Sequence, residues 1–152
     1  MKKIDSFFIF LATYFGIGRL PKAPGTWATI ATIPLFLVMA KLSPVTYMMV
    51  VFCICLVGIY ASQVYEKYSN KHDSQEIVID EVAGFLITMT LVPVNSLNIA
   101  IGFVLFRLLD IFKPGPIGYL DRKVQGGMGV MVDDIAAGLL ASIIMQIYLN
   151  YF

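Results

Sequence analysis

The sequence has few charged side chains. Lys, Arg, Asp and Glu make up 14% of its 152 residues, whereas hydrophobic residues make up 59%. Soluble domains contain roughly a quarter charged residues. A chain this short needs few apolar side chains to fill a core, so the surplus must face lipid. The net charge is only +1. No basic stripe of the kind that binds nucleic acid is present, so we expect membrane lipid and no nucleic acid as partners.

Cysteine and histidine are also scarce, which excludes several kinds of site. Cys53 and Cys55 are the only cysteines, and on a helix they point to opposite sides, so neither a disulfide nor a zinc site is expected. A Cys-x5-Arg phosphatase motif is absent, because Ile59 and Ala61 stand where the arginine would be. The single His72 cannot supply both the nucleophile and the acid of a two-histidine phosphatase. We expect it in a solvated loop.

Apolar segments fill most of the chain. They cover residues 27–40, 45–62, 77–94, 97–111 and 130–152. A helix needs about 20 residues to span a bilayer, so the shorter segments would require tilt or local thinning. The segment 7–15 is too short to span and is expected as an interfacial or buried helix. With no linker or repeat, residues 1–152 are predicted to form one all-α domain, a multi-pass transmembrane helical bundle of about five spans.

The basic residues indicate an orientation. With five spans and a cytoplasmic N-terminus, only Lys41 lies outside. The cytoplasmic segments hold all the others: Lys2, Lys3, Arg19, Lys22, Lys67, Lys71, Arg107, Lys113, Arg122 and Lys123. This satisfies the positive-inside rule. We therefore expect the N-terminus inside, the C-terminus outside and the site on the cytoplasmic face.

Four carboxylates stand where apolar segments begin. Asp80 and Glu81 open the third segment, and Asp133 and Asp134 open the fifth. An ionised carboxylate at membrane depth costs about 2.5–3.5 kcal/mol on insertion scales. A helix N-terminus returns only about 0.3–1 kcal/mol of this. The remainder calls for cations.

Two sources of cations are open. Arg107, Asp110 and Lys113 follow at i, i+3 and i+6, where Arg107 and Asp110 can form a helical ion pair worth about 0.2–0.5 kcal/mol. The alternative is a metal ion. Adjacent helical residues diverge by about 100°, so we expect one carboxylate from each acidic pair, joined by Asp110, to hold it. Oxygen ligands favour Mg²⁺ or Mn²⁺. Interhelical salt bridges with snorkelling lysines would explain the same residues without a metal.

Two glycine-containing segments could approach an anion. Thr26 is expected as an N-cap, and the free N–H groups of that helix start would bind phosphate near Arg19 and Lys22. A capped helix after a Pro-Gly turn is the simpler interpretation. The segment 126–129, GGMG, could either bring backbone close to a ligand or form a tight loop.

Four segments together resemble the phosphatidylglycerophosphatase A family, in the same order along the chain. They are PGT at 24–26, IDEVAG at 79–84, FRLLDIFKPGPI at 106–117, and LDR at 120–122 followed by GGMGVMVDD at 126–134. One departure is that Ala28 and Thr29 stand where the family often has Gly-Ser.

The resemblance implies an all-helical enzyme of the bacterial cytoplasmic membrane. Its activity would be Mg²⁺-dependent hydrolysis of phosphatidylglycerol phosphate, giving phosphatidylglycerol and phosphate. The expected metal ligands are Asp80, Glu81, Asp110, Asp133 and Asp134. Of these, Glu81, Asp110 and Asp134 are also expected to be catalytic, and the expected phosphate-binding residues are Arg107, Lys113, Thr26, Arg19 and Lys22. The nucleophile stays open between a water activated by a carboxylate and a carboxylate itself.

Three other functions fit parts of the pattern. A phospholipid synthase of the CDP-alcohol phosphatidyltransferase type would show two aspartates at i, i+4 on one helix after an Asp-Gly pair, and that array is absent. A cation channel or transporter would place charges near mid-membrane, where this chain has none. A non-enzymatic, cation-binding adaptor would not explain why acidic and basic groups converge from four cytoplasmic segments.

Overall fold

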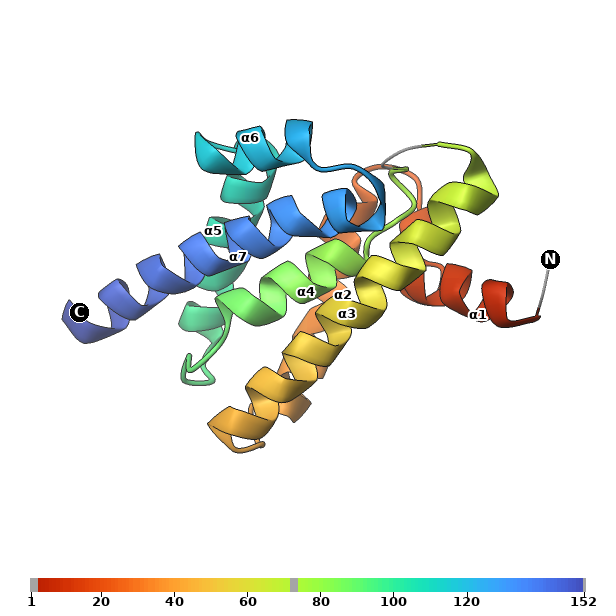
Figure 1. Ribbon diagram of the computed structural model, residues 1–152. Coiled ribbons are helices and arrows are strands. Elements are labelled where there is room, and N and C mark those ends of the chain that lie inside the picture. The colour runs from red at the N-terminus through yellow and green to blue at the C-terminus, as the bar shows by residue number, and fades with distance from the viewer. Residues whose placement is uncertain (1–2, 72–73, 152) are drawn as a thin grey trace.

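The computed structural model is built of helices, with no strand among the residues that it describes, 3–71 and 74–151 (Figure 1). His72 lies outside these residues. The elements, in chain order, are α1 (Lys3–Ala12), the 3-10 turn η1 (Ile17–Arg19), α2 (Pro24–Met39), α3 (Pro44–Ser69), α4 (Ile79–Thr88), α5 (Ser96–Phe112), α6 (Pro116–Lys123) and α7 (Gly126–Tyr151). The predicted all-α class is confirmed.

Local sequence explains where several helices begin. Ser43 caps α3, because its hydroxyl accepts the Thr46 N–H at 3.2 Å, and Pro44 follows at the first helical position. Asn95 caps α5 in the same way through the Asn98 N–H, at 2.7 Å. Both caps lie in the gaps between the apolar segments of the sequence.

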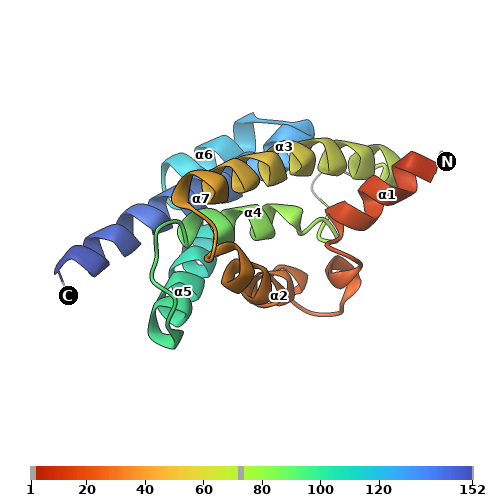
Figure 2. The same cartoon turned by 90° about the horizontal axis from the view of Figure 1, so that it is seen from below.

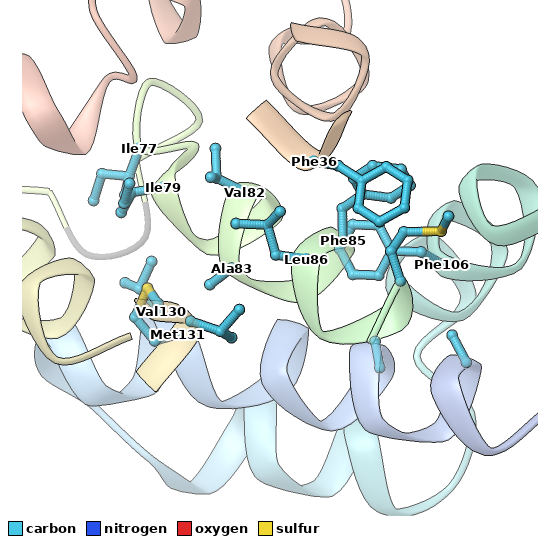
Figure 3. Close-up of a cluster of buried hydrophobic side chains, with 14 of the residues drawn as sticks. Phe36, Ile77, Ile79, Val82, Ala83, Phe85, Leu86, Phe106, Val130 and Met131 are labelled. Carbon is cyan, nitrogen blue, oxygen red and sulfur yellow. The ribbon is translucent and has the colours of Figure 1, made fainter. Parts of the chain in front are cut away.

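The short helix α4 forms the centre of the molecule. Seen from below, it lies between α3 and α2 (Figure 2), and it also packs along α7. Its apolar side chains Phe85 and Leu86 are fully buried, and they lie between Phe36 of α2, Phe106 of α5 and Met131 of α7 (Figure 3). The core therefore fixes α4, and the two acidic residues in its first turn, relative to the other helices.

Helices α4 and α7 approach each other through two glycines. A Cβ atom on Gly138 would overlap the carbonyl oxygen of Gly84, and a Cβ on Gly84 would overlap Phe106. We expect Gly138→Val to lower the free energy of unfolding by about 3 kcal/mol, at the upper end of overpacking costs, because the obstacle is backbone. Denaturation in detergent measures this. Leu139→Ala, at an exposed neighbour, is the control and should change stability by less than about 1 kcal/mol.

The prediction of five spans is not supported. Within residues 3–71 and 74–151, only α3 and α7, with 26 residues each, are long and apolar enough to cross a membrane. Helices α2, α4 and α5 have 16, 10 and 17 residues, short of the roughly 20 required. The apolar segment 77–94 misleads because it continues through a turn: α4 ends at Thr88, and Leu91 has a φ of 59°.

Helix α1 has only 10 residues and packs against α3. It buries Ile9 and Ala12 and exposes Phe7 and Phe10. Helix α1 and the C-terminal end of α7 lie at opposite ends of the molecule (Figures 1 and 2).

Candidate active site

Four helices bring their polar residues to one cavity. The N-terminal turns of α2 and α4, the C-terminal end of α5 and the N-terminal half of α7 enclose a volume of about 290 Å³. The segment between α3 and α4 adds Ser74, Gln75 and Ile77 to the lining. The charged residues in the wall are Asp80, Glu81, Arg107, Asp110, Lys113, Asp133 and Asp134. The structure thus brings together all seven of these residues, each of which the sequence analysis singles out.

Three carboxylates form a compact group inside this cavity. One oxygen each of Asp80, Glu81 and Asp134 lies within 4.8 Å of the others. The sequence favoured one carboxylate from each acidic pair at a shared metal site, but Asp80 and Glu81 both belong to this group. Their Cα–Cβ directions diverge, but Glu81 is longer by one methylene, and Asp80 Oδ1 folds back to accept the Glu81 N–H at 3.0 Å. Both side chains can therefore reach Asp134.

Charge in the cavity is unbalanced. Its wall has five carboxylates and two cations, an excess of three negative charges when all are ionised. Burial raises the pKa of Asp80 well above its usual range, and the carboxylates of Glu81 and Asp134 raise it further. Burial also raises the pKa of Glu81. Groups in this condition are stabilised by a cation bound between them.

Arg107 lies among the carboxylates with its side chain only 14% exposed. Its Nη1 donates to Asp110 Oδ2 at 2.5 Å, so the predicted helical pair is present, and it is 3.8 Å from Glu81 Oε1. The Nε atom has no hydrogen-bond partner among the described residues. Arg107 is therefore held at one nitrogen and retains a buried donor.

Lys113 forms the second ion pair. Its Nζ donates to Asp133 Oδ2 at 2.6 Å. Lys113 follows α5 in the left-handed conformation, with a φ of 43°, which ends the helix and lets the chain turn toward α6. Asp133 pairs with Lys113, and Asp110 pairs with Arg107. Among the described residues, neither aspartate belongs to the three-carboxylate group.

The two acidic pairs have different environments, contrary to the expectation that both open a helix. Asp80 and Glu81 are in the first turn of α4, where the helix dipole stabilises anions. Helix α7 begins at Gly126, so Asp133 and Asp134 lie about two turns inside it and gain little from the dipole. Asp134 is also only 3% exposed. Its negative charge therefore needs a cation in the cavity to stabilise it.

The glycines at 126 and 127 serve packing. Gly127 lies against α3, where a Cβ would overlap the Ile59 carbonyl oxygen, and its N–H donates to Gln63 Oε1 at 3.1 Å. The segment does not form a tight loop, and none of its residues lines the cavity described above. The segment is the first turn of α7.

Gly25 is a site residue that the sequence analysis missed. A Cβ on Gly25 would overlap Glu81 Oε1 and come within 3.2 Å of Arg107 Nη1. The Pro-Gly pair was interpreted as a turn, but Pro24 is the first residue of α2, a position that proline favours. The expected N-cap at Thr26 is therefore wrong. Thr26 is inside the helix, its N–H donates to the Ala23 carbonyl at 3.0 Å, and it does not line the cavity.

Arg19 and Lys22 do not reach the carboxylates. They line a second cavity of about 440 Å³, whose wall shares Ala23, Pro24 and Gln75 with the first. There Arg19 Nε is 3.4 Å from Glu76 Oε2. The expected single phosphate site is thus divided between two adjoining cavities.

Comparison with known proteins found a matching family model and several relatives. The family model for phosphatidylglycerophosphatase A matches residues 10–149. Proteins named phosphatidylglycerophosphatase A from Escherichia coli K12 and Haemophilus influenzae are 42% identical over 133 residues and 37% identical over 137 residues. These matches cover 87% and 89% of this chain, and 77% and 84% of the relatives.

A third relative, from Bacteroides thetaiotaomicron, is named as a candidate phosphatidylinositol-3-phosphatase. It is 30% identical over 155 residues, which cover 97% of this chain and 96% of the relative. No solved structure matches. The family model and the two more similar relatives confirm the predicted resemblance, and the chain belongs to the phosphatidylglycerophosphatase A family.

Proposed function

We propose that this protein removes the terminal phosphate of phosphatidylglycerol phosphate, as the names of its relatives indicate for them. The observation that supports this is the cavity that Arg107 and Lys113 share with a group of three carboxylates, two of them buried. A phosphatidyltransferase and a non-enzymatic cation-binding protein are not favoured, since the family is a phosphatase family.

A divalent cation, Mg²⁺ or in its place Mn²⁺, is part of the proposal. Asp80, Glu81 and Asp134 would hold it, because their oxygens are hard ligands and lie close together. Glu81 Oε2 and Asp134 Oδ2 are buried without a hydrogen-bond partner among the described residues, which fits a missing ligand. When bound, the ion supplies positive charge that stabilises the phosphoryl group in the transition state. Without it, a phosphate dianion would be repelled by the excess negative charge.

The chain's own residues would bind and orient the phosphate. Arg107 is anchored by Asp110 and has further N–H donors for phosphoryl oxygens, which its planar fork can grip. Lys113 adds a second positive charge from the end of α5. Asp110 lies outside the three-carboxylate group and pairs with Arg107. We assign to Asp110 the role of general base, which accepts a proton from the attacking water.

Metal removal tests the function and the ion together. Purified protein in mixed micelles should release phosphate from phosphatidylglycerol phosphate with Mg²⁺, and excess EDTA should lower the rate at least about 100-fold, because several kcal/mol of transition-state stabilisation are lost. Added Mg²⁺ or Mn²⁺ should restore it. Phosphatidylinositol 3-phosphate is the comparison substrate, chosen from the third relative's name.

Three results would contradict this proposal in different ways. Hydrolysis that is unaffected by EDTA would remove the metal and leave the phosphatase. Faster hydrolysis of the inositol lipid than of phosphatidylglycerol phosphate would keep the lipid phosphomonoesterase but change its substrate. Absence of phosphate release from both lipids would remove the enzyme.

The orientation in the membrane is also a proposal. Helix α3 ends, and α7 begins, at the end of the molecule where the cavity lies, so their other ends point to the opposite side. With the site in the cytoplasm, a reporter fused at the C-terminus should be active outside. A fusion after Ser69, at the end of α3, is the matched control and should be active inside. Cytoplasmic activity of the C-terminal fusion would contradict this orientation.

A further inference from the structure

The second cavity has the chemistry of an anion site. Arg19 and Lys22 line it against one carboxylate, Glu76, so its wall has one positive charge in excess. The Arg19–Glu76 pair is 3.4 Å long and the Arg19 side chain is 57% exposed. Exposed pairs of this kind contribute little to stability, so an incoming phosphate can displace Glu76 from the guanidinium. This charge balance is opposite to that of the first cavity, which contains the five carboxylates and which we call the carboxylate cavity.

The backbone that presents these two cations is fixed. Gly18 packs so closely on the segment before α4 that a Cβ there would overlap the Glu76 carbonyl oxygen. The Arg19 N–H donates to the Gly16 carbonyl at 3.1 Å, which holds η1 in place. Arg19 is therefore presented from a short, closely packed turn.

Lys22 is held in a strained conformation. Lys22 and Ala23 both have left-handed backbone, with φ values of 64° and 50°. Neither is glycine, and Ala23 also precedes a proline, so the backbone conformation is unfavourable at both positions. Strain of this kind is concentrated at sites where the chain must aim particular groups. Here it joins the turn that presents Arg19 to the helix start that carries Gly25.

Apolar side chains are exposed along the segment that leads into this cavity. Leu20 is part of its wall and is exposed, while Phe15, which is 56% exposed and precedes η1 by two residues, lines a separate apolar cavity. The ring of Phe15 packs on Phe10 at a centroid distance of 5.2 Å. Exposed aromatic and aliphatic side chains beside cationic ones are typical of protein surfaces at the level of lipid headgroups. A ligand with a lipid part as well as an anionic part would fit this surface.

We propose that Arg19 and Lys22 bind the phosphodiester that joins a phospholipid headgroup to its diacylglycerol, while the terminal phosphate of that headgroup occupies the adjoining carboxylate cavity. This inference rests on the proposed function. The two cavities share the wall formed by Ala23, Pro24 and Gln75, so one headgroup can extend over that wall from one cavity to the other.

The charges of the two phosphates match this assignment. A phosphodiester is a monoanion and suits a cavity with a single positive excess and no requirement for a metal. A phosphomonoester is mostly a dianion at neutral pH, and it enters a cavity with excess negative charge only together with a divalent cation. The arrangement would select lipids that carry both phosphates over lipids with a phosphodiester alone.

The test compares the double variant Arg19→Ala/Lys22→Ala with the wild type on phosphatidylglycerol phosphate in mixed micelles. Hydrogen bonds to charged groups typically contribute tenfold or more in affinity, so we expect KM to rise about ten- to hundredfold. We expect kcat to change less than about threefold, because neither side chain touches the reacting phosphate. Inhibition by inorganic phosphate, which probes the carboxylate cavity alone, should keep its wild-type inhibition constant.

Two further variants complete the experiment. Lys67→Ala removes an exposed cation from the last turn of α3, outside the second cavity, and should keep the wild-type KM. Lys22→Ala alone, at an exposed side chain, provides a test even if the double variant does not fold, and should raise KM about tenfold.

An unchanged KM in Lys22→Ala and the double variant would overturn the inference and leave the proposed function intact. The inference would also be overturned by an equal rise in KM for Lys67→Ala, which would show general attraction to anionic lipid. A parallel loss of phosphate inhibition would overturn it as well. No hydrolysis by the wild type would instead remove the proposed function itself.

Discussion

Replacing Asp134 by Asn should abolish activity and at the same time stabilise the metal-free protein. Asp134 is almost fully buried and belongs to the three-carboxylate group. Loss of the proposed ion would cost several kcal/mol in the transition state, so we expect the rate to fall about 10³-fold. Without metal, the amide removes like-charge repulsion from Asp80 and Glu81, so the melting temperature should rise.

Thermal unfolding in detergent gives a readout besides activity. At a Mg²⁺ concentration 100 times its dissociation constant, a native-state ligand adds about 2.7 kcal/mol, or roughly 5–10 °C in Tm for a chain of this size. Wild type and Asp110→Asn should show this increase, because Asp110 is outside the proposed ligand group, whereas Asp134→Asn should not. A full Mg²⁺ response in Asp134→Asn would remove this residue from the metal site.

Asp133→Asn is the matched control at the neighbouring position. It breaks the 2.6 Å pair with Lys113 and leaves that partly buried cation with less compensation. We expect the metal-free protein to lose about 1–3 kcal/mol of stability, while its Mg²⁺ response persists. Adjacent carboxylates should thus change metal-free stability in opposite directions, which a general role as surface charges would not produce.

Arg107→Lys should lower kcat about 100-fold while leaving the Mg²⁺ response intact. A lysine keeps the charge and can still pair with Asp110, but it cannot grip two phosphoryl oxygens with a planar fork. The expected size corresponds to the roughly 2.7–4 kcal/mol lost when one well-placed donor is removed from an oxyanion site. Steady-state kinetics on phosphatidylglycerol phosphate measures it.

Two further variants distinguish a phosphate clamp, in which Arg107 grips the phosphoryl oxygens, from a purely structural ion pair. If Arg107 only pairs with Asp110, the losses in Arg107→Lys and Asp110→Asn should overlap in the double variant. If Arg107 acts on the phosphate and Asp110 on the water, the losses should largely add. A near-wild-type kcat in Arg107→Lys would refute the clamp, and Lys113 would then be the residue to examine.

The sequence identified the polar residues of the site better than it identified the membrane spans. Charged side chains in an apolar chain are conspicuous, because each must find a partner, and all seven that line the carboxylate cavity were recognised for that reason. Spans were overcounted because hydrophobicity does not record where a helix ends. The turn after Thr88 is as apolar as the helix before it, so no local signal marks it.

The details that the sequence missed depend on long-range packing. Gly25 was interpreted from its neighbours as part of a turn, whereas its role depends on Glu81, more than 50 positions later. The division of the basic residues between two cavities likewise depends on Glu76 and Gln75, which the sequence separates widely from Arg19. Local propensity contains no information about such contacts.

The shortness of α4 has a consequence for how the protein is made. With 10 residues and two acidic side chains in its first turn, α4 is too short and too polar to partition into lipid by itself during synthesis. It packs most extensively on α7, which is translated last of the helices described here. We therefore expect α4 to stay packed against α2 and α3 in the nascent chain until α7 emerges. Polypeptides truncated before Gly126 would leave the acidic first turn of α4 without its cover and should be cleaved by proteases sooner than the full chain.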